Sequence, residues 1–72
     1  MPKRPVVSGA QAVRALERLG YVAVRQRGSH VVPRRAEKGC IVPLHGKIRA
    51  GTLATILRRA DVPAADFFGA IR

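Results

Sequence analysis

The 72-residue sequence has little of what small proteins use for crosslinking or membrane insertion. It contains one cysteine and no tryptophan, which excludes an intramolecular disulfide and leaves few aromatic platforms for single-stranded nucleic acid. No apolar run approaches the roughly 20 residues of a membrane-spanning helix, and the N-terminus lacks the apolar core of a signal peptide. We therefore expect one cytoplasmic domain over residues 1–72, with residues 1–7 as an extended lead-in.

Acidic residues are also rare. Four Asp and Glu stand against fourteen Lys and Arg, which leaves a net charge of +10. This charge density attracts polyanions through counterion release, so nucleic acid is the first candidate partner. The carboxylates are scattered along the sequence, so no local pair is placed to hold Mg²⁺. Cys40 and His45 could both bind zinc, but a closed site would lack a fourth ligand. We expect no metal or cofactor, and we expect Cys40 to be a buried thiol.

Local patterns predict an α+β fold that begins with a helix. Ser8 and Gln11 have the spacing of a capping box, and they precede a helix predicted over residues 9–19. Gly20 follows as the stop signal. Near the C-terminus, a second helix is expected over residues 52–60, and a short third helix is expected to begin at Pro63.

Three strands are predicted between the first two helices, at residues 21–27, 29 to about 34, and 40–44. Gly28 and Ser29 form the first turn, and the charged segment 35–39 forms the second. Because these strands follow one another with short turns, we expect an antiparallel sheet with helices packed on one face.

Strand parity predicts where the two histidines point. Side chains alternate between the two faces of a strand, so His30 faces away from the helices if Val31 faces them. By the same argument His45 faces outward if Leu44 faces inward. A register slip of one residue would instead make His30 a hydrogen-bonded core histidine.

An outward histidine suits RNA cleavage through the 2′-hydroxyl of the RNA itself. Histidine ordinarily titrates near pH 6.5, so it can take up and return a proton near neutrality. Two histidines in a chain of this length also fit structural or RNA-contact roles.

Basic residues concentrate around these histidines and predict a basic rim that contacts RNA phosphates. They are Arg25, Arg27, Arg34, Arg35, Lys38, Lys47 and Arg49. The alternative interpretation is an ordinary solvated hairpin.

Four segments, in this order, resemble the HicA toxins of bacterial HicA/HicB toxin–antitoxin systems. They are SGAQAVRALERLGYVAVRQRGSHVV, IVPLHGK, AGTLATILRRA and DFF. The resemblance covers roughly residues 6–68. Its most specific parts are RQRGSH, VPLHGK and GTLATILRRA at their mutual distances.

The resemblance implies a double-stranded-RNA-binding-domain-like fold and a metal-independent messenger RNA interferase. It also implies neutralisation by a HicB-type antitoxin, which covers the active site and is the link to operator DNA. The histidine of the Gly-Ser-His motif, His30 here, is implied to be catalytic. His45 of the VPxH motif is implied to support catalysis or contact substrate. Gly28 is implied to be the turn glycine that presents the histidine, with Ser29 as its neighbour.

Two alternatives compete with the ribonuclease hypothesis. One is a non-catalytic RNA-binding module that reads A-form shape through the same basic rim. The other is a toxin whose main output is binding to its antitoxin, and through it to operator DNA. Cleavage that is lost in a His30→Ala variant separates the ribonuclease hypothesis from both alternatives.

Overall fold

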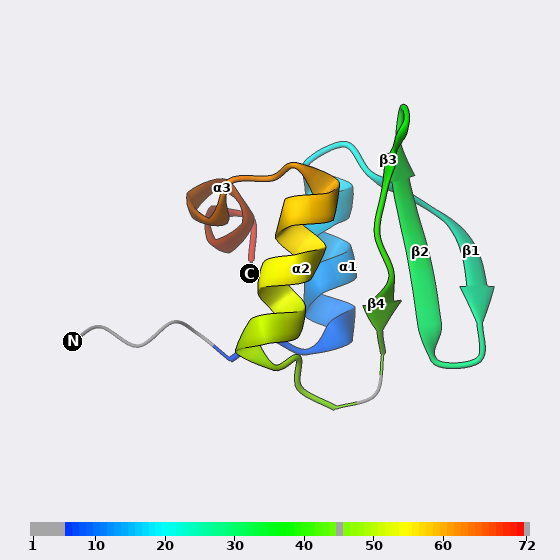
Figure 1. The fold of residues 1–72 in the computed structure, drawn as a ribbon, viewed down its shortest axis with the longest axis horizontal. Helices are drawn as coiled ribbons and strands as arrows, with labels where there is room; N and C mark the ends of the chain where they lie inside the picture. Colours follow the sequence, from blue (N-terminus) through cyan, green and yellow to red (C-terminus); the bar gives the residue numbers. More distant parts are fainter. Residues whose placement is uncertain (1–5, 45, 72) are drawn as a thin grey trace.

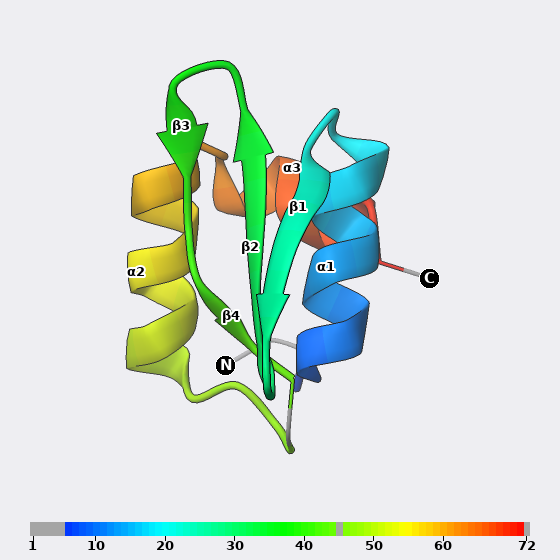
Figure 2. The same ribbon diagram turned by 90° about the vertical axis from the view of Figure 1, so that its right-hand side faces the viewer.

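An antiparallel sheet carries helices on one face and leaves its other face open (Figures 1 and 2). The computed structural model describes residues 6–44 and 46–71. Its elements are α1 (Gly9–Arg18), β1 (Val22–Arg27), β2 (His30–Arg35), β3 (Lys38–Gly39), β4 (Val42–Pro43), α2 (Ala50–Ala60) and α3 (Ala64–Gly69). This confirms the predicted α+β class and is consistent with a double-stranded-RNA-binding-domain-like fold.

Both ends of α1 are closed by the residues that the sequence singled out. The Ser8 hydroxyl accepts a hydrogen bond from the Gln11 amide at 3.1 Å, and the Gln11 side chain accepts one from the Ser8 amide at 3.0 Å. At the other end the Tyr21 N–H donates to the Leu16 carbonyl across Gly20, the long closure of a Schellman motif. The capping box predicted the helix start correctly.

Strand β2 lies at the centre of the sheet, between β1 on one side and β3 with β4 on the other. The two short strands belong to a single interrupted strand, because Arg34 pairs with Gly39 and Val31 pairs with Val42 in the same register. The strand predicted over residues 40–44 is therefore split, and it begins earlier than expected.

Pro33 explains the interruption. The Cys40 N–H donates to the Pro33 carbonyl at 3.3 Å, but proline has no N–H with which to return the bond. The predicted loop over residues 35–39 is also too long. Only Ala36 and Glu37 form the turn, and Ala36 has a positive φ of 55°.

The hydrophobic core lies between the helices and the inner face of the sheet. Its fully buried members include Ala12, Ala15 and Leu16 of α1 and Phe67 of α3. Leu53, Ile56 and Leu57 of α2 are also buried, as their helical spacing predicted.

The predicted lead-in over residues 1–7 ends inside this core. Val7 is 1% exposed, and its carbonyl accepts a hydrogen bond from the Ile48 amide at 2.8 Å. Ser8 forms an isolated antiparallel bridge with Lys47 next to it. The end of the lead-in therefore ties the start of α1 to the segment that precedes α2.

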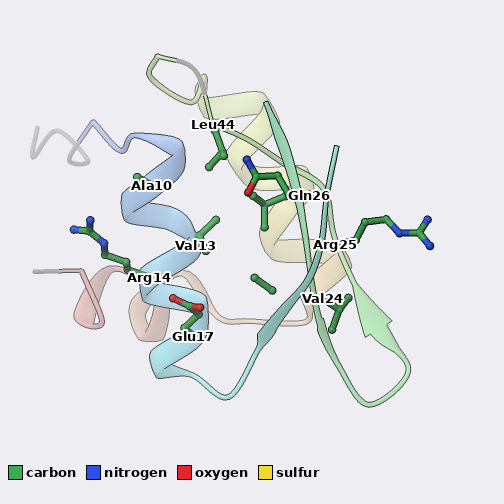
Figure 3. A pocket seen from close by; sticks show the side chains of 10 residues that line it. Ala10, Val13, Arg14, Glu17, Val24, Arg25, Gln26 and Leu44 are labelled. Carbon is green, nitrogen blue, oxygen red and sulfur yellow. The ribbon is translucent and has the colours of Figure 1, made fainter. Parts of the chain in front are cut away.

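Strand β1 stands apart from α1, and all six of its side chains are exposed. A groove of about 420 Å³ separates the two elements (Figure 3). The side of β1 toward α1 carries Ala23 and Gln26, which are too small or too polar to complete a core contact.

Within the described residues, no helix has the length and hydrophobicity needed to cross a bilayer.

Candidate functional site

His30 is the first residue of β2, and its side chain is exposed. Its neighbours Val31 and Pro33 are buried, whereas Val32 is half-buried and Arg34 is exposed. This alternation puts His30, Val32 and Arg34 on the open face of the sheet, as the parity argument predicted. The direct partners of His30 are Arg27 of β1 and Pro43 of β4.

A β-bulge at Val24 brings two arginines onto this open face. Ala23 pairs with Pro33, but the next pair is Arg25 with Val32, so Val24 is an extra residue in β1. Partners in an antiparallel pair project from the same face. In a regular strand Arg25 would lie opposite the buried Val31 instead. The bulge therefore reverses the parity of the second half of β1.

Figure 3 shows the result, with the Arg25 side chain pointing away from α1 and the Gln26 side chain pointing toward it. Arg27, the direct partner of His30, lies on the same face as Arg25. Both arginines are exposed. The open face therefore carries an imidazole next to two guanidinium groups.

A two-residue turn holds His30 in place. Gly28 has a φ of 56°, and Ser29 has no positive φ, the pattern of a type II′ hairpin turn with glycine at its first central position. The Gln26 side-chain amide donates to the Gly28 carbonyl at 3.2 Å, and the Leu44 N–H donates to the Ser29 carbonyl. These bonds connect the turn to β1 on one side and to the end of β4 on the other.

Two further cations lie at the same end of the molecule. Lys47 and Arg49 belong to the segment between β4 and α2, and this segment lies at the same end as the β1–β2 turn in both ribbon views (Figures 1 and 2). Both side chains are exposed. We call this region the His30 end, defined by residues 27–30 and 46–49.

The four Asp and Glu side chains lie toward the opposite end. Glu17 is in the last turn of α1, Glu37 is in the β2–β3 turn, Asp61 follows α2, and Asp66 is in α3. Helices α1 and α2 also both begin at the His30 end, so the positive ends of their dipoles point there. The His30 end therefore has a positive potential that no aspartate or glutamate of the described residues offsets, which suits a phosphate chain.

Arg35 and Lys38 do not join the basic rim. The Arg35 guanidinium donates to the Leu19 carbonyl at 2.6 Å and lies 4.8 Å from the centre of the Tyr21 ring, on the helix side of the sheet. Lys38 forms an ion pair with Asp61. Both side chains connect the far end of the sheet to the helices.

Two other predictions differ in outcome. His45 lies outside the described residues, so its predicted role stays a prediction. Cys40 is 3% exposed, as expected of a buried thiol, and burial raises its pKa. Among the described residues, no three histidine, cysteine, aspartate or glutamate side chains gather into a potential metal site.

Sequence reasoning missed Gly9, which positions the strand beside His30. A Cβ on Gly9 would lie 2.0 Å from the Pro43 carbonyl oxygen, so only glycine lets α1 approach β4 this closely. Glycine in the first turn of a helix, where alanine has the higher propensity, was the available signal.

Comparison with known proteins gives one result. A family model described as the HicA toxin of bacterial toxin–antitoxin systems matches residues 9–62, which is most of the chain. No curated protein matches the chain significantly.

Proposed function

The chain belongs to the HicA toxin family of bacterial toxin–antitoxin systems, and from that premise we propose that it is a metal-independent endoribonuclease that cleaves messenger RNA with His30 as its acid/base. The observation that carries the proposal is the position of the exposed His30 directly opposite Arg27, at the end of the molecule away from the carboxylates. This arrangement combines a proton acceptor with a charge that attracts phosphate.

The proposed step needs a proton acceptor, a proton donor and a phosphate anchor. His30 removes the proton from a ribose 2′-hydroxyl, and the 2′-oxygen forms a bond to the adjacent phosphorus. The bond from phosphorus to the 5′-oxygen breaks, and the protonated His30 returns its proton to that oxygen. The products are a 2′,3′-cyclic phosphate and a 5′-hydroxyl, so the reaction needs no water in its first step.

The cations at the His30 end have separate roles in this proposal. Arg27 contacts the scissile phosphate, where negative charge accumulates on the phosphoryl oxygens. Arg25, Lys47 and Arg49 bind the phosphates on either side and hold the strand in register, and Arg34 on the same open face is a further phosphate contact. His45 follows β4 in the chain, and we assign it a supporting or substrate-contacting role.

Membership of the family also supports a partner. We propose that a HicB-type antitoxin neutralises the protein by covering the His30 end, and that contact with operator DNA occurs only through this antitoxin. Messenger RNA as substrate places the activity in the cytoplasm.

Expression in bacterial cells tests the proposal. Wild type and an Arg58→Ala control are expected to arrest growth, whereas His30→Ala at the same soluble level is expected not to. His30 is exposed, so its loss leaves the core intact. Arrest by His30→Ala equal to that by wild type would overturn the assignment of His30.

A further inference from the structure

A second groove, of about 520 Å³, lies between α2 and the outer edge of the split strand formed by β3 and β4. The strand contributes residues 39–41, and α2 contributes Thr55, Ile56 and Arg59 among others. From β2 the groove is lined by Val32 and Arg34. His30 begins β2 and is not among the lining residues.

The strand presents unused backbone groups to this groove. The Cys40 N–H donates to Pro33 of β2, and the backbone groups of successive strand residues point to opposite sides. The N–H and C=O groups of Gly39 and Ile41 therefore point away from β2, toward α2. No other strand of the described chain pairs with this edge. The ladder is open to one more strand here.

One large apolar side chain is exposed at this edge. Ile41 is 60% exposed, and it lies between Lys38 of β3 and Pro43 of β4, the residue types that ordinarily protect an edge strand. Val32 and Ile56 line the same groove on either side of it. In an extended chain paired with this edge, every second side chain would project to the same face of the sheet as Ile41 and could cover it.

Charge identifies the kind of chain that fits. Arg34 and Arg59 line the groove, and none of its lining residues is acidic. A second copy of this protein is disfavoured, because each copy carries a net charge of +10. Nucleic acid has no backbone that pairs with a strand edge, and no aromatic side chain lines the groove for base stacking.

We propose that this groove binds an extended acidic segment of a partner protein. The segment adds a strand to the β3–β4 edge through Gly39 and Ile41, packs apolar side chains against Ile41, and places carboxylates near Arg34 and Arg59. This binding does not use His30, although it does use Arg34, which lies on the same open face of the sheet.

The probe for this test is a fluorescein-labelled peptide of alternating valine and glutamate, titrated with the full-length protein in an anisotropy assay. Arg59→Glu is expected to weaken binding at least tenfold, because it replaces a charge-assisted contact by repulsion. Arg58→Glu is the matched control, because it makes the same charge change one residue earlier, outside the groove. It is expected to weaken binding less than threefold.

A second variant tests the backbone pairing. Ile41→Pro removes the N–H that points into the groove without removing a bond to β2, so the protein is expected to stay folded and lose the peptide. In NMR titrations the amides of Gly39 and Ile41 are expected to shift most.

Several results would overturn the proposal. One is an equal loss of peptide affinity in Arg59→Glu and Arg58→Glu. Another is an NMR titration in which the amides of residues 25–30 shift most. A third is displacement of the peptide by polyuridylate in the His30→Ala background. We expect His30→Ala to bind the peptide as tightly as wild type does. This expectation holds whether or not the protein proves to be a ribonuclease.

Discussion

Arg27 and His30 are direct partners across the β1–β2 ladder, and the bulge at Val24 places them on the same face. In a regular strand with the pairing of Ala23 and Pro33 kept, Gln26 would lie opposite His30 instead. One extra residue therefore decides whether a guanidinium or an amide stands next to the imidazole. The proposed chemistry depends on this relationship.

Arg27→Gln is expected to lower the cleavage rate about ten- to a hundredfold, because a neutral amide stabilises developing phosphoryl charge less well. Arg27→Lys is expected to recover part of the loss. Single-turnover cleavage of a labelled RNA at saturating protein measures this effect apart from binding. An Arg27→Gln rate equal to that of wild type would remove Arg27 from the proposed site.

The two hairpin turns provide an opposed pair of substitutions. Gly28 and Ala36 have nearly the same positive φ, which costs a residue with a Cβ about 1 kcal/mol or more. Gly28→Ala is expected to destabilise the fold by roughly that amount, and Ala36→Gly to stabilise it by a similar or smaller amount. Urea unfolding of both variants measures the free energies. The same sign of change for both would contradict the turn geometry.

Gly9→Ala is expected to destabilise the protein although alanine is the better helix former. The new Cβ would overlap the Pro43 carbonyl, and relieving such overpacking typically costs about 1–3 kcal/mol. Because Pro43 pairs with His30, the variant is also expected to cleave RNA more slowly while still folded. Gly51→Ala is the control, since a Cβ there meets nothing within 4 Å. Stabilisation by Gly9→Ala would refute the close contact.

The ion pair between Lys38 and Asp61 predicts a pH dependence of stability. The hydrogen bond and charge of Lys38 lower the pKa of Asp61 below its ordinary value. A carboxylate with a lowered pKa stabilises the fold above its unfolded pKa, about 3.9, and loses that contribution as the pH falls further.

Lys38→Met is therefore expected to be less stable than wild type at pH 7, with the difference shrinking toward pH 3. Urea midpoints at the two pH values measure this difference. Asp61→Asn and the double variant complete a double-mutant cycle for the ion pair. A difference that grows in acid would show that the pair does not act in this way.

Local signals in the sequence predicted the parts of the fold that depend on neighbouring residues. Ser8 and Gln11 marked the start of α1, because a capping box is formed within four residues. Alternation predicted that His30 faces outward if Val31 faces the helices, and the burial of Val31 and Pro33 excludes the register slipped by one residue.

Features that depend on contacts distant in sequence could not be predicted. The bulge at Val24 has no glycine or proline to mark it, and it exists because of how β1 pairs with β2. Arg35 and Arg27 are both arginines of the basic cluster predicted from the sequence. Arg35 nevertheless contacts Leu19 and Tyr21 on the helix side. A basic cluster in sequence therefore overstated the basic surface near His30.

The most direct test of the central claim is cleavage of an end-labelled RNA by purified wild type and His30→Ala in EDTA, from pH 5 to 9. The proposal predicts that wild type alone cleaves, that the rate changes across the range where histidines titrate, and that the product carries a 2′,3′-cyclic phosphate. Cleavage by folded His30→Ala at the wild-type rate, or folded wild type that binds this RNA and leaves it intact, would contradict it.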